Sequence, residues 1–523
     1  MKRFAFATAL VCLLGAALSA EGSKDAAKPA ASAGGTQEVT WMVHMDLATN
    51  KSWTTTAVPA LLKKYGFDVS FKMVEMGTHN GTEYYEKLKT YIASGGAPAD
   101  ILHFAGLQQP AVDAGWYTEI TEALIQKNMP KYYVNAKKIY EKIFAYGKDA
   151  DSGKLYGMVS WNMFGPTRHT FVYRKDWLDQ LGMKTPATIV EFEQFLRKVR
   201  TVDFNGNGEK DEYGYTSGTN SALAGFNEVF GAYGTMPLFW MVKDGKVQRA
   251  EVLPGSKEAL AVLAKWYAED LIPRGVGTTE TRRDGFNQGI RGSYGQADGY
   301  APALVKGGQN YEEFYKMQPK GVMLPAPSFK GPRGEWGTVE WGPRKYSVGF
   351  GSHLQKNPAK VDMLMKMLET IAVNEDTFVA SMLGEKGKHW DFTDASKPSG
   401  ATKFLEPFTE FNKRLDEVGV REMSESPYGP IWVEDVYKKY LDPLAIEYSQ
   451  HNPGIYDALM QIPFAAQTKY GADLDKLTKE TYLAIITGKK PIGEFDVYVQ
   501  TWMKNGGEEM TKAAQAFYDK VFK

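Results

Sequence analysis

Residues 203–214, DFNGNGEKDEYG, concentrate oxygen-bearing side chains at the spacing of a cation-binding loop. Asp203, Asn205 and Asn207 stand at positions 1, 3 and 5, and a glycine follows each asparagine. Carboxylate and amide oxygens are ligands of hard cations, and the glycines allow tight turns between them. The beginning of the segment therefore matches that of an EF-hand loop, in which position 7, here Glu209, contributes its backbone carbonyl.

The end of the same segment departs from the EF-hand pattern. Position 12 is Gly214, so the closing bidentate glutamate is missing, and we expect Asp211 and Glu212 to replace it. A set made only of oxygen ligands suits Ca²⁺ and does not suit Zn²⁺ or Cu²⁺. Because a filled oxygen cage has no open position for activating water, the predicted ion is structural. The alternative is an acidic Asn-Gly turn that binds no metal. The predicted calcium ligands are Asp203, Asn205, Asn207, Glu209, Asp211 and Glu212.

The catalytic motifs that can be recognised from spacing alone are missing. The chain has no HExxH among its seven histidines, no GxSxG, no GxxxxGKS/T and no GxGxxG after a strand. The paired carboxylates of a glycosidase can lie anywhere in a sequence, so a polysaccharide-degrading enzyme stays as an alternative. We predict a protein that is not an enzyme.

The elements that must position these residues alternate between strand and helix. In the first third of the chain, strand-like segments at 38–45, 67–76 and 99–104 enclose segments of helical spacing. This alternation predicts βαβ units and a largely parallel sheet, with ligands beyond the carboxyl ends of the strands. A second α/β region follows through residue 214, and the pattern after about residue 401 is mainly helical. Its 523 residues exceed what one core supports, so we expect at least two lobes.

The overall composition is that of a soluble globular protein. Apolar residues make up 43% and charged residues 24% of the chain. Lys plus Arg and Asp plus Glu number 62 each, which gives no electrostatic reason to expect nucleic acid or an anionic membrane as a partner. Aromatic residues are plentiful at 13%, and their flat faces serve both cores and binding clefts.

The N-terminus has the pattern of an export signal. Basic MKR, an apolar run and LSA before Glu21 predict a signal peptide over residues 1–20, which contains Cys12, the only cysteine. LSAEGSK is similar to a bacterial lipoprotein box with Glu21 in place of the lipidated cysteine, so no thioether lipid is expected. Residues 21–37 have the composition of a flexible leader. The mature protein is predicted to be soluble, in a periplasm or another extracytoplasmic space.

Residues 171–214 also carry a family resemblance, in FVYRKDWLDQLG, the TPAT turn, the following helix and the loop ending Asp-Glu. The segment resembles the family 1 extracellular solute-binding proteins of ABC transporters, in the LipO-like and alginate-oligosaccharide-binding branch. Segments 92–102, 152–158 and 486–507 agree with it, although Ala99 is inserted between proline and aspartate in the first.

The resemblance implies an α/β, two-lobed periplasmic-binding-protein fold of type II, with a hinge and a ligand cleft between the lobes. The implied division places 38–150 and 325–374 in lobe one and 151–324 and 375–523 in lobe two, with the calcium loop at 203–212. It further implies a monomeric receptor that binds an oligosaccharide and delivers it to the permease subunits of an ABC importer. A binding protein for a non-sugar solute such as a peptide is the remaining alternative.

Sugar recognition requires flat aromatic faces and hydroxyl-binding polar groups, so residues in loops after strands are the candidates. The predicted ligand-binding residues are His44, Asp46, Trp161, Asn162, Trp240, Tyr300, Trp341 and Trp390. Three further tryptophans, Trp177, Trp266 and Trp502, lie on helical faces and are expected to pack in the core. Arg282 and Arg283 could pair a uronate carboxylate, but TRRDGF fits a solvated helix start equally well.

Overall fold

In the computed structural model, most of the chain between residues 35 and 522 is described. The described residues are 35–43, 57–76, 82–104, 106–161, 169–215, 223–276, 282–295, 299–340, 344–394, 396, 400–410, 413, 417, 438–460, 462 and 464–522. The predicted signal peptide lies outside them, as do most of the leader and the site candidates His44, Asp46, Asn162 and Trp341. Among the described residues, no helix combines the length and apolar character needed to cross a membrane.

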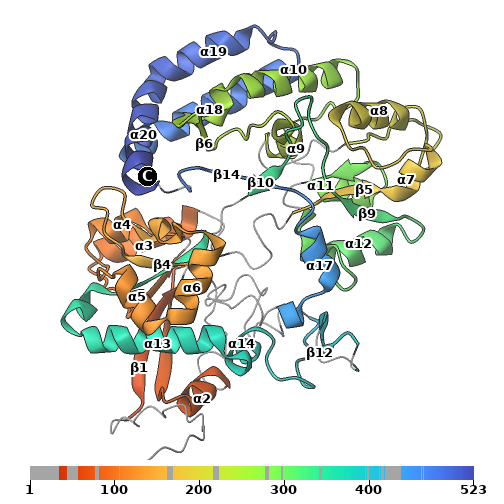
Figure 1. The fold of residues 1–523 in the computed structure, drawn as a ribbon. Coiled ribbons are helices and arrows are strands. Elements are labelled where there is room, and N and C mark those ends of the chain that lie inside the picture. The colour runs from red at the N-terminus through yellow and green to blue at the C-terminus, as the bar shows by residue number, and fades with distance from the viewer. Residues whose placement is uncertain are drawn as a thin grey trace, which may run out of the picture.

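The first sheet lies in the lower half of Figure 1 and has five strands in the order β2-β1-β3-β11-β4. The strands are β1 (Gln37–Val43), β2 (Val69–Glu75), β3 (Ile101–Phe104), β4 (Gly157–Trp161) and β11 (Arg344–Phe350). β1 pairs in parallel with β2 and β3, as the alternation predicted, whereas β11 is antiparallel to β3 and β4. Because side chains alternate along a strand, Trp41 and Met42 enter separate core clusters on the two faces.

Helices cover this sheet and complete lobe one. They are α2 (Ala57–Lys64), α3 (Thr82–Ala93), α4 (Gln109–Asp113), α5 (Glu122–Asn128), α6 (Pro130–Ile139), α13 (Pro358–Val373) and α14 (Glu375–Met382). A buried carboxylate ties the sheet to α13, because Asp100, just before β3, accepts hydrogen bonds from the Thr40 amide at 2.9 Å and from Lys360 Nζ at the same distance.

The second sheet, in the upper half of Figure 1, has the order β8-β5-β9. Its strands are β5 (Phe171–Arg174), β8 (Ser293–Tyr294) and β9 (Met323–Ala326), and both pairings are antiparallel. The expected helix after the TPAT turn is α8 (Ile189–Val199). Thr188 accepts from the Glu191 amide and the Glu191 side chain accepts from the Thr188 amide, which is a complete capping box.

Lobe two is mainly helical toward the C-terminus, as the sequence pattern predicted. Its helices are α7 (Lys175–Gln180), α9 (Asn227–Gly231), α10 (Pro254–Ala268), α11 (Arg282–Asn287), α12 (Gln309–Met317), α17 (Pro443–Tyr448), α18 (Ala465–Ile486), α19 (Glu494–Trp502) and α20 (Glu508–Phe522). Trp177, Trp266 and Trp502 are all at most 2% exposed, so the prediction that they pack in the core is confirmed.

Strand pairing places individual elements near the predicted boundaries at 150/151, 324/325 and 374/375, which stay a prediction. β4, just after the first boundary, pairs in the first sheet, and β9, which spans the second boundary, pairs in the second sheet. α14 packs beside α2 in lobe one, where the Tyr65 hydroxyl donates to Asp376 at 2.8 Å. The chain therefore passes between the sheets after β4 and again after β10 (Thr338–Glu340). A strand joins the sheet that offers it a free edge, and a local pattern does not contain that information.

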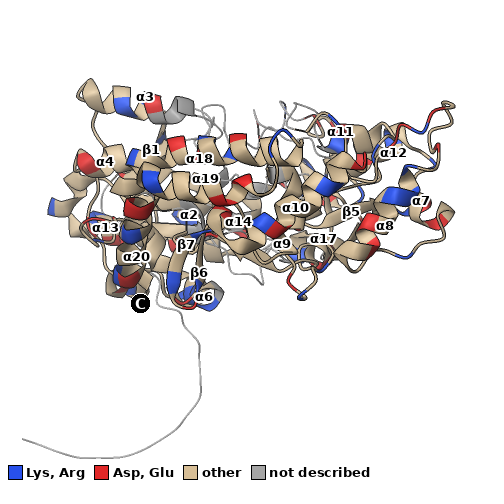
Figure 2. Ribbon diagram, turned by 90° about the horizontal axis from the view of Figure 1, so that it is seen from above, with Lys and Arg blue, Asp and Glu red and all other residues tan. Residues whose placement is uncertain are grey.

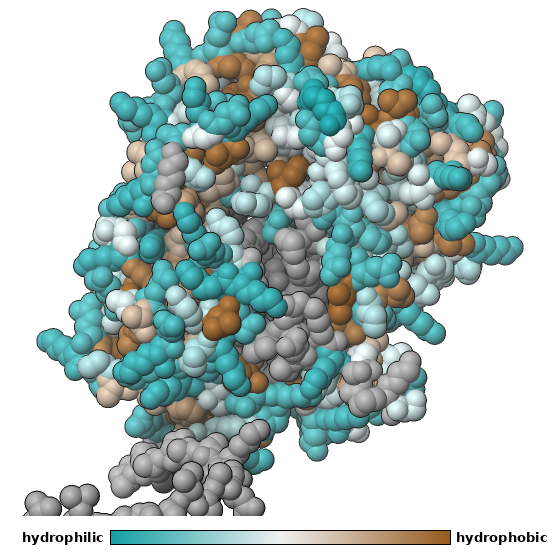
Figure 3. Space-filling view, viewed as in Figure 1, coloured by the Kyte–Doolittle hydropathy of each residue, from teal (hydrophilic) through white to brown (hydrophobic). Residues whose placement is uncertain are grey.

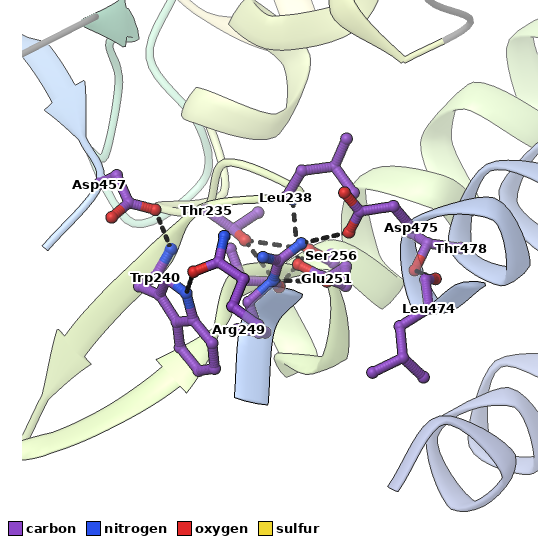
Figure 4. A network of polar contacts seen from close by, with 12 residues as sticks. Thr235, Leu238, Trp240, Arg249, Glu251, Ser256, Asp457, Leu474, Asp475 and Thr478 are labelled. Carbon is purple, nitrogen blue, oxygen red and sulfur yellow. Dashed lines mark hydrogen bonds and ion pairs between the residues drawn. The ribbon is translucent and has the colours of Figure 1, made fainter. Parts of the chain in front are cut away.

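A buried polar network fixes the hairpin of β6 (Trp240–Lys243) and β7 (Lys246–Arg249) to α18 (Figure 4). Arg249 pairs with Glu251 at 2.8 Å and with Asp475 of α18 at 2.6 Å. The Trp240 amide donates to Asp457 at 2.7 Å. Removing one partner of such a network would leave a buried charge without compensation. The network therefore favours the one position of the hairpin in which all partners are paired.

Charged residues of both signs are interspersed along the chain. In Figure 2, basic and acidic positions occur together on most of the helices in view. On the face shown in Figure 3, hydrophobic residues are scattered among hydrophilic ones. This distribution agrees with the balanced composition of the chain.

Candidate functional site

The predicted cation loop is shaped by its own asparagine and aspartate side chains. Asp203 accepts from the amides of Gly206 at 2.6 Å and Gly208 at 2.8 Å, and these glycines have φ of 75° and 90°. Asn205 Oδ1 accepts from the Asn207 amide at 2.9 Å, in the same kind of turn. The backbone hydrogen bonds, that from Gly208 first, hold the pKa of Asp203 below its usual value. The carboxylate is therefore ionised over the physiological pH range.

Glu212 supplies the observation that tests whether the loop suits a cation. Its side chain is fully buried, and Oε1 accepts from the amides of Phe204 at 2.8 Å and Asn205 at 2.9 Å. Oε2 is also buried and has no hydrogen-bond partner within the described part of the chain. A buried carboxylate oxygen without a partner is costly, and a cation beside it would satisfy it. The donor set fits Ca²⁺.

The remaining acidic ligand of the prediction lies at the rim of the loop. Asp211 is exposed, and Asn207 Nδ2 is 3.5 Å from each of its carboxylate oxygens. In the described residues no three His, Cys, Asp or Glu side chains are gathered closely enough to form a metal site by themselves. The predicted ligand set differs from such a cluster, because it also uses side-chain amide oxygens and a backbone carbonyl oxygen.

The loop is anchored to the core of lobe two from both ends. Phe204 stacks on Trp177 with ring centroids 4.1 Å apart and planes inclined by 11°. The Arg200 guanidinium donates to the carbonyls of Lys210 at 2.7 Å and Glu212 at 2.9 Å. An ion held by this loop would therefore stabilise the junction between α8 and the segment that begins at Tyr213.

The second candidate region is the edge of the lobe-two sheet where the chain passes to lobe one. β5 begins at this edge, and the antiparallel strands β8 and β9 end there. Tyr300 lies beside the start of β5, bridged to His169, with their ring centroids 6.3 Å apart. Tyr300 is partly exposed, so it remains a ligand candidate.

Two of the predicted ligand-binding tryptophans are core residues instead. Trp240 is 1% exposed, lies against Phe464 with the two rings tilted, and donates from Nε1 to Gln467 at 3.4 Å. Trp390 is 2% exposed and donates from Nε1 to the Gly384 carbonyl at 3.2 Å. Both rings are almost completely buried, so neither presents a face to a ligand in this conformation. Trp161 lies at the end of β4, where only its backbone is described.

The sequence analysis did not identify two buried carboxyl groups, those of Glu228 and Glu340. Glu228 on α9 is 1% exposed and accepts from Thr338 Oγ1 at 3.0 Å and from the Tyr215 hydroxyl at 3.2 Å. Glu340, the last residue of β10, is 6% exposed, and its burial raises its pKa to about 8. Only the aromatic ring of Trp341, next in sequence, marked this segment as a candidate.

Two sheets covered by helices and linked by repeated chain crossings are the architecture expected of a two-lobed solute-binding protein, and comparison with known proteins shows the family. The chain belongs to the bacterial extracellular solute-binding protein family, whose model matches residues 49–348. It is 23% identical over 456 residues to Lipoprotein LipO of Bacillus subtilis, covering 84% of each chain. It is 22% identical to the polygalacturonan/rhamnogalacturonan-binding protein YtcQ of B. subtilis, covering 71% of this chain and 70% of YtcQ.

Solved structures show the same fold. A HMO-binding ABC-transporter-associated solute-binding protein from Bifidobacterium longum infantis matches with a TM-score of 0.68 at 17% identity, covering 94% of this chain and 99% of the other. The Streptococcus pneumoniae substrate-binding protein FusA, as an EF-hand mutant with fructo-nystose, matches with a TM-score of 0.62 at 17% identity, covering 92% and 99%. The predicted two-lobed type II binding-protein fold is thereby confirmed, and family members are binding proteins.

Proposed function

We propose that this protein is the extracytoplasmic receptor of an ABC importer and binds an oligosaccharide between its two lobes. The observation that carries the proposal is the fold: the chain crosses between two separate sheets, in a family of extracellular solute-binding proteins. Relatives named for sugars support the choice of ligand class. Closure of such lobes about a hinge would present one conformation to the permease.

A thermal-shift screen against an oligosaccharide library tests this function. A receptor predicts a rise in melting temperature with the sugar unchanged by mass spectrometry, because binding to the native state stabilises it by mass action. An enzyme instead predicts new reducing ends. A rise in melting temperature with peptides and none with any sugar would contradict the proposal.

We further propose that the loop at 203–212 holds a structural Ca²⁺ through Asp203, Asn205, Asn207, Glu209, Asp211 and Glu212. The unpartnered oxygen of Glu212 supports it, and a related protein, FusA, is described with an EF-hand. When bound, the ion would supply charge neutralisation between α8 and Tyr213, with no part in ligand chemistry.

We propose that the protein is located outside the cytoplasm without a lipid anchor. This proposal rests on the signal pattern and on Glu21 in the position of a lipidated cysteine. A monomer is proposed from the family resemblance alone. Mass spectrometry of native protein should find an N-terminus near Glu21 and no diacylglyceryl adduct. An adduct of that mass would contradict the proposal.

A further inference from the structure

The last turn of α20, at the C-terminal end of lobe two, contacts lobe one. Lys520 Nζ donates hydrogen bonds to the carbonyl oxygens of Asp151 at 2.8 Å and Ala150 at 3.3 Å. In the opposite direction, Lys142 Nζ of lobe one donates to the carbonyl oxygen of Phe522. Figure 1 shows this end of α20, marked C, directly above lobe one. The two lobes are therefore joined at a place where the chain itself does not cross.

Both sides of this contact are held by their own lobe. In lobe two, the Gln515 side chain of α20 accepts from the Val247 amide of β7 at 2.8 Å. In lobe one, the acceptor carbonyls belong to a turn between η1 (Ile143–Gly147) and β4. The Asp149 side chain accepts from the Ser152 amide at 2.8 Å and closes this turn. A change in the orientation of the lobes is therefore transmitted to the contact.

The end of α20 is covered as well as hydrogen-bonded. Phe522 is only 6% exposed, whereas the last residues of a domain are usually poorly ordered unless docking holds them. The hydrophobic cluster that contains Phe522 also contains Phe144 of lobe one. The last carbonyls of a helix have no partner within it, and the Lys142 ammonium satisfies one of them at the negative end of the helix dipole. Single hydrogen bonds contribute little, so the buried ring and the two opposed lysines act together.

The contact lies beside one of the chain crossings. Burial raises the pKa of Tyr140, at the end of α6, and the nearby Tyr456 and Tyr518 raise it further. Tyr140 of lobe one therefore lies close to both β14 (Gly454–Tyr456) and α20. β14 pairs with β10, and Tyr456 is opposite Glu340, after which the chain passes to lobe one. A contact so close to a crossing can persist while distant parts of the lobes move.

We propose that the last turn of α20 is a strap that restricts the two lobes of the ligand-free protein to a narrow range of orientations. Lys142, Lys520 and Phe522 form the strap. Two chain crossings alone would permit the lobes to twist as well as to close. A third contact beside them removes part of this freedom, so less conformational entropy is lost when the lobes close. This inference goes beyond the proposed function and depends on no particular ligand.

Distances between spin labels on the two lobes of the ligand-free mature chain test the strap. The only cysteine of the chain lies in the predicted signal peptide, so labels can be attached at Lys366→Cys on α13 and Glu480→Cys on α18, both exposed positions. In this background, Lys142→Met combined with Lys520→Met keeps the apolar stems and removes both donors. We expect pulsed electron paramagnetic resonance to record a broader distribution of distances, and hydrogen exchange to be faster in residues 150–153.

Two further chains complete the test. A chain that ends at Asp519 lacks the whole strap and should broaden the distribution at least as much, and the double variant decides if this shorter chain does not fold. Lys512→Met, at an exposed lysine about two turns earlier on α20, is the matched control and should leave the distribution unchanged. Faster exchange with an unchanged distance distribution would show that the lysines stabilise only the helix end, and would overturn the strap. The receptor function would still stand, because no ligand enters this measurement.

Discussion

Buried carboxyl groups in this protein differ in the direction in which their surroundings shift the pKa. Asp100 is 4% exposed, but it accepts hydrogen bonds from Thr40, from Lys360 and from His353 Nε2 at 3.0 Å. Burial alone would raise its pKa, and these donors outweigh it and hold the pKa of Asp100 below its usual value. The ionised group therefore joins β1, β3 and α13 in lobe one.

Asp100→Asn should destabilise lobe one by about 3 kcal/mol at neutral pH, because it removes one partner of a buried ion pair. A lowered pKa means that the contribution is present above the unfolded-state pKa near 4 and is lost as pH falls through the native pKa. Denaturant unfolding at a series of pH values measures this. The difference between wild type and variant should shrink below about pH 4, and a constant difference would contradict the assignment.

Glu340 has the opposite linkage. Its pKa is raised to about 8, so its contribution to stability is complete below the unfolded-state value and is lost as pH rises toward 8. Without ligand, Glu340→Gln should be more stable than wild type at pH 8, by about 1–3 kcal/mol for a buried polar group. The two proteins should converge near pH 4.5, the ordinary value for glutamate. Melting curves across this range test it, and parallel curves would show that Glu340 titrates normally.

At the scale of elements, the loop at 203–212 joins α8 to the segment entering the core at Tyr213. Chelation should lower the melting temperature, and Ca²⁺ should restore it better than Mg²⁺, which demands a tighter octahedral site. At a free Ca²⁺ concentration one hundred times its dissociation constant, binding adds about 2.7 kcal/mol to the free energy of unfolding. The calorimetric melting temperature with and without chelator is the measurement.

Paired variants identify the ligands of this loop. Asp203→Ala should abolish the effect of chelator, whereas Glu209→Ala should preserve it, because position 7 contributes its carbonyl and not its side chain. Sugar affinity should be unchanged in both. Identical melting of wild type with and without chelator, together with no calcium by elemental analysis, would show that the loop is only a turn.

At the scale of the whole molecule, the two sheets are connected after β4 and after β10, so ligand binding should bring the lobes together. Small-angle scattering should record a smaller radius of gyration with saturating sugar. The change should persist in Asp203→Ala, since the loop lies within lobe two. Saturable binding with an unchanged scattering curve would show that the lobes do not move.

Much of this arrangement is encoded in local sequence. The capping box at Thr188 and the turns of the loop depend on residues within a few positions of one another, and helical spacing alone predicted that Trp177, Trp266 and Trp502 face the core. Helical and strand periodicity and short-range hydrogen bonds depend only on such spacing, so they could be predicted before any partner was known.

The tertiary structure alone decided which residues are covered and which sheet each strand joins. β11 pairs with β3 across nearly half of the chain, Trp240 and Trp390 are buried, and Glu340 is buried beside Gly454. Burial and strand pairing depend on what packs against a residue, and a local pattern is the same whether that partner is present or absent. For this reason the sequence by itself determined the class, the loop and the helical cores, whereas the acidic edge of lobe two emerged only when β10 was placed beside α9 and β14.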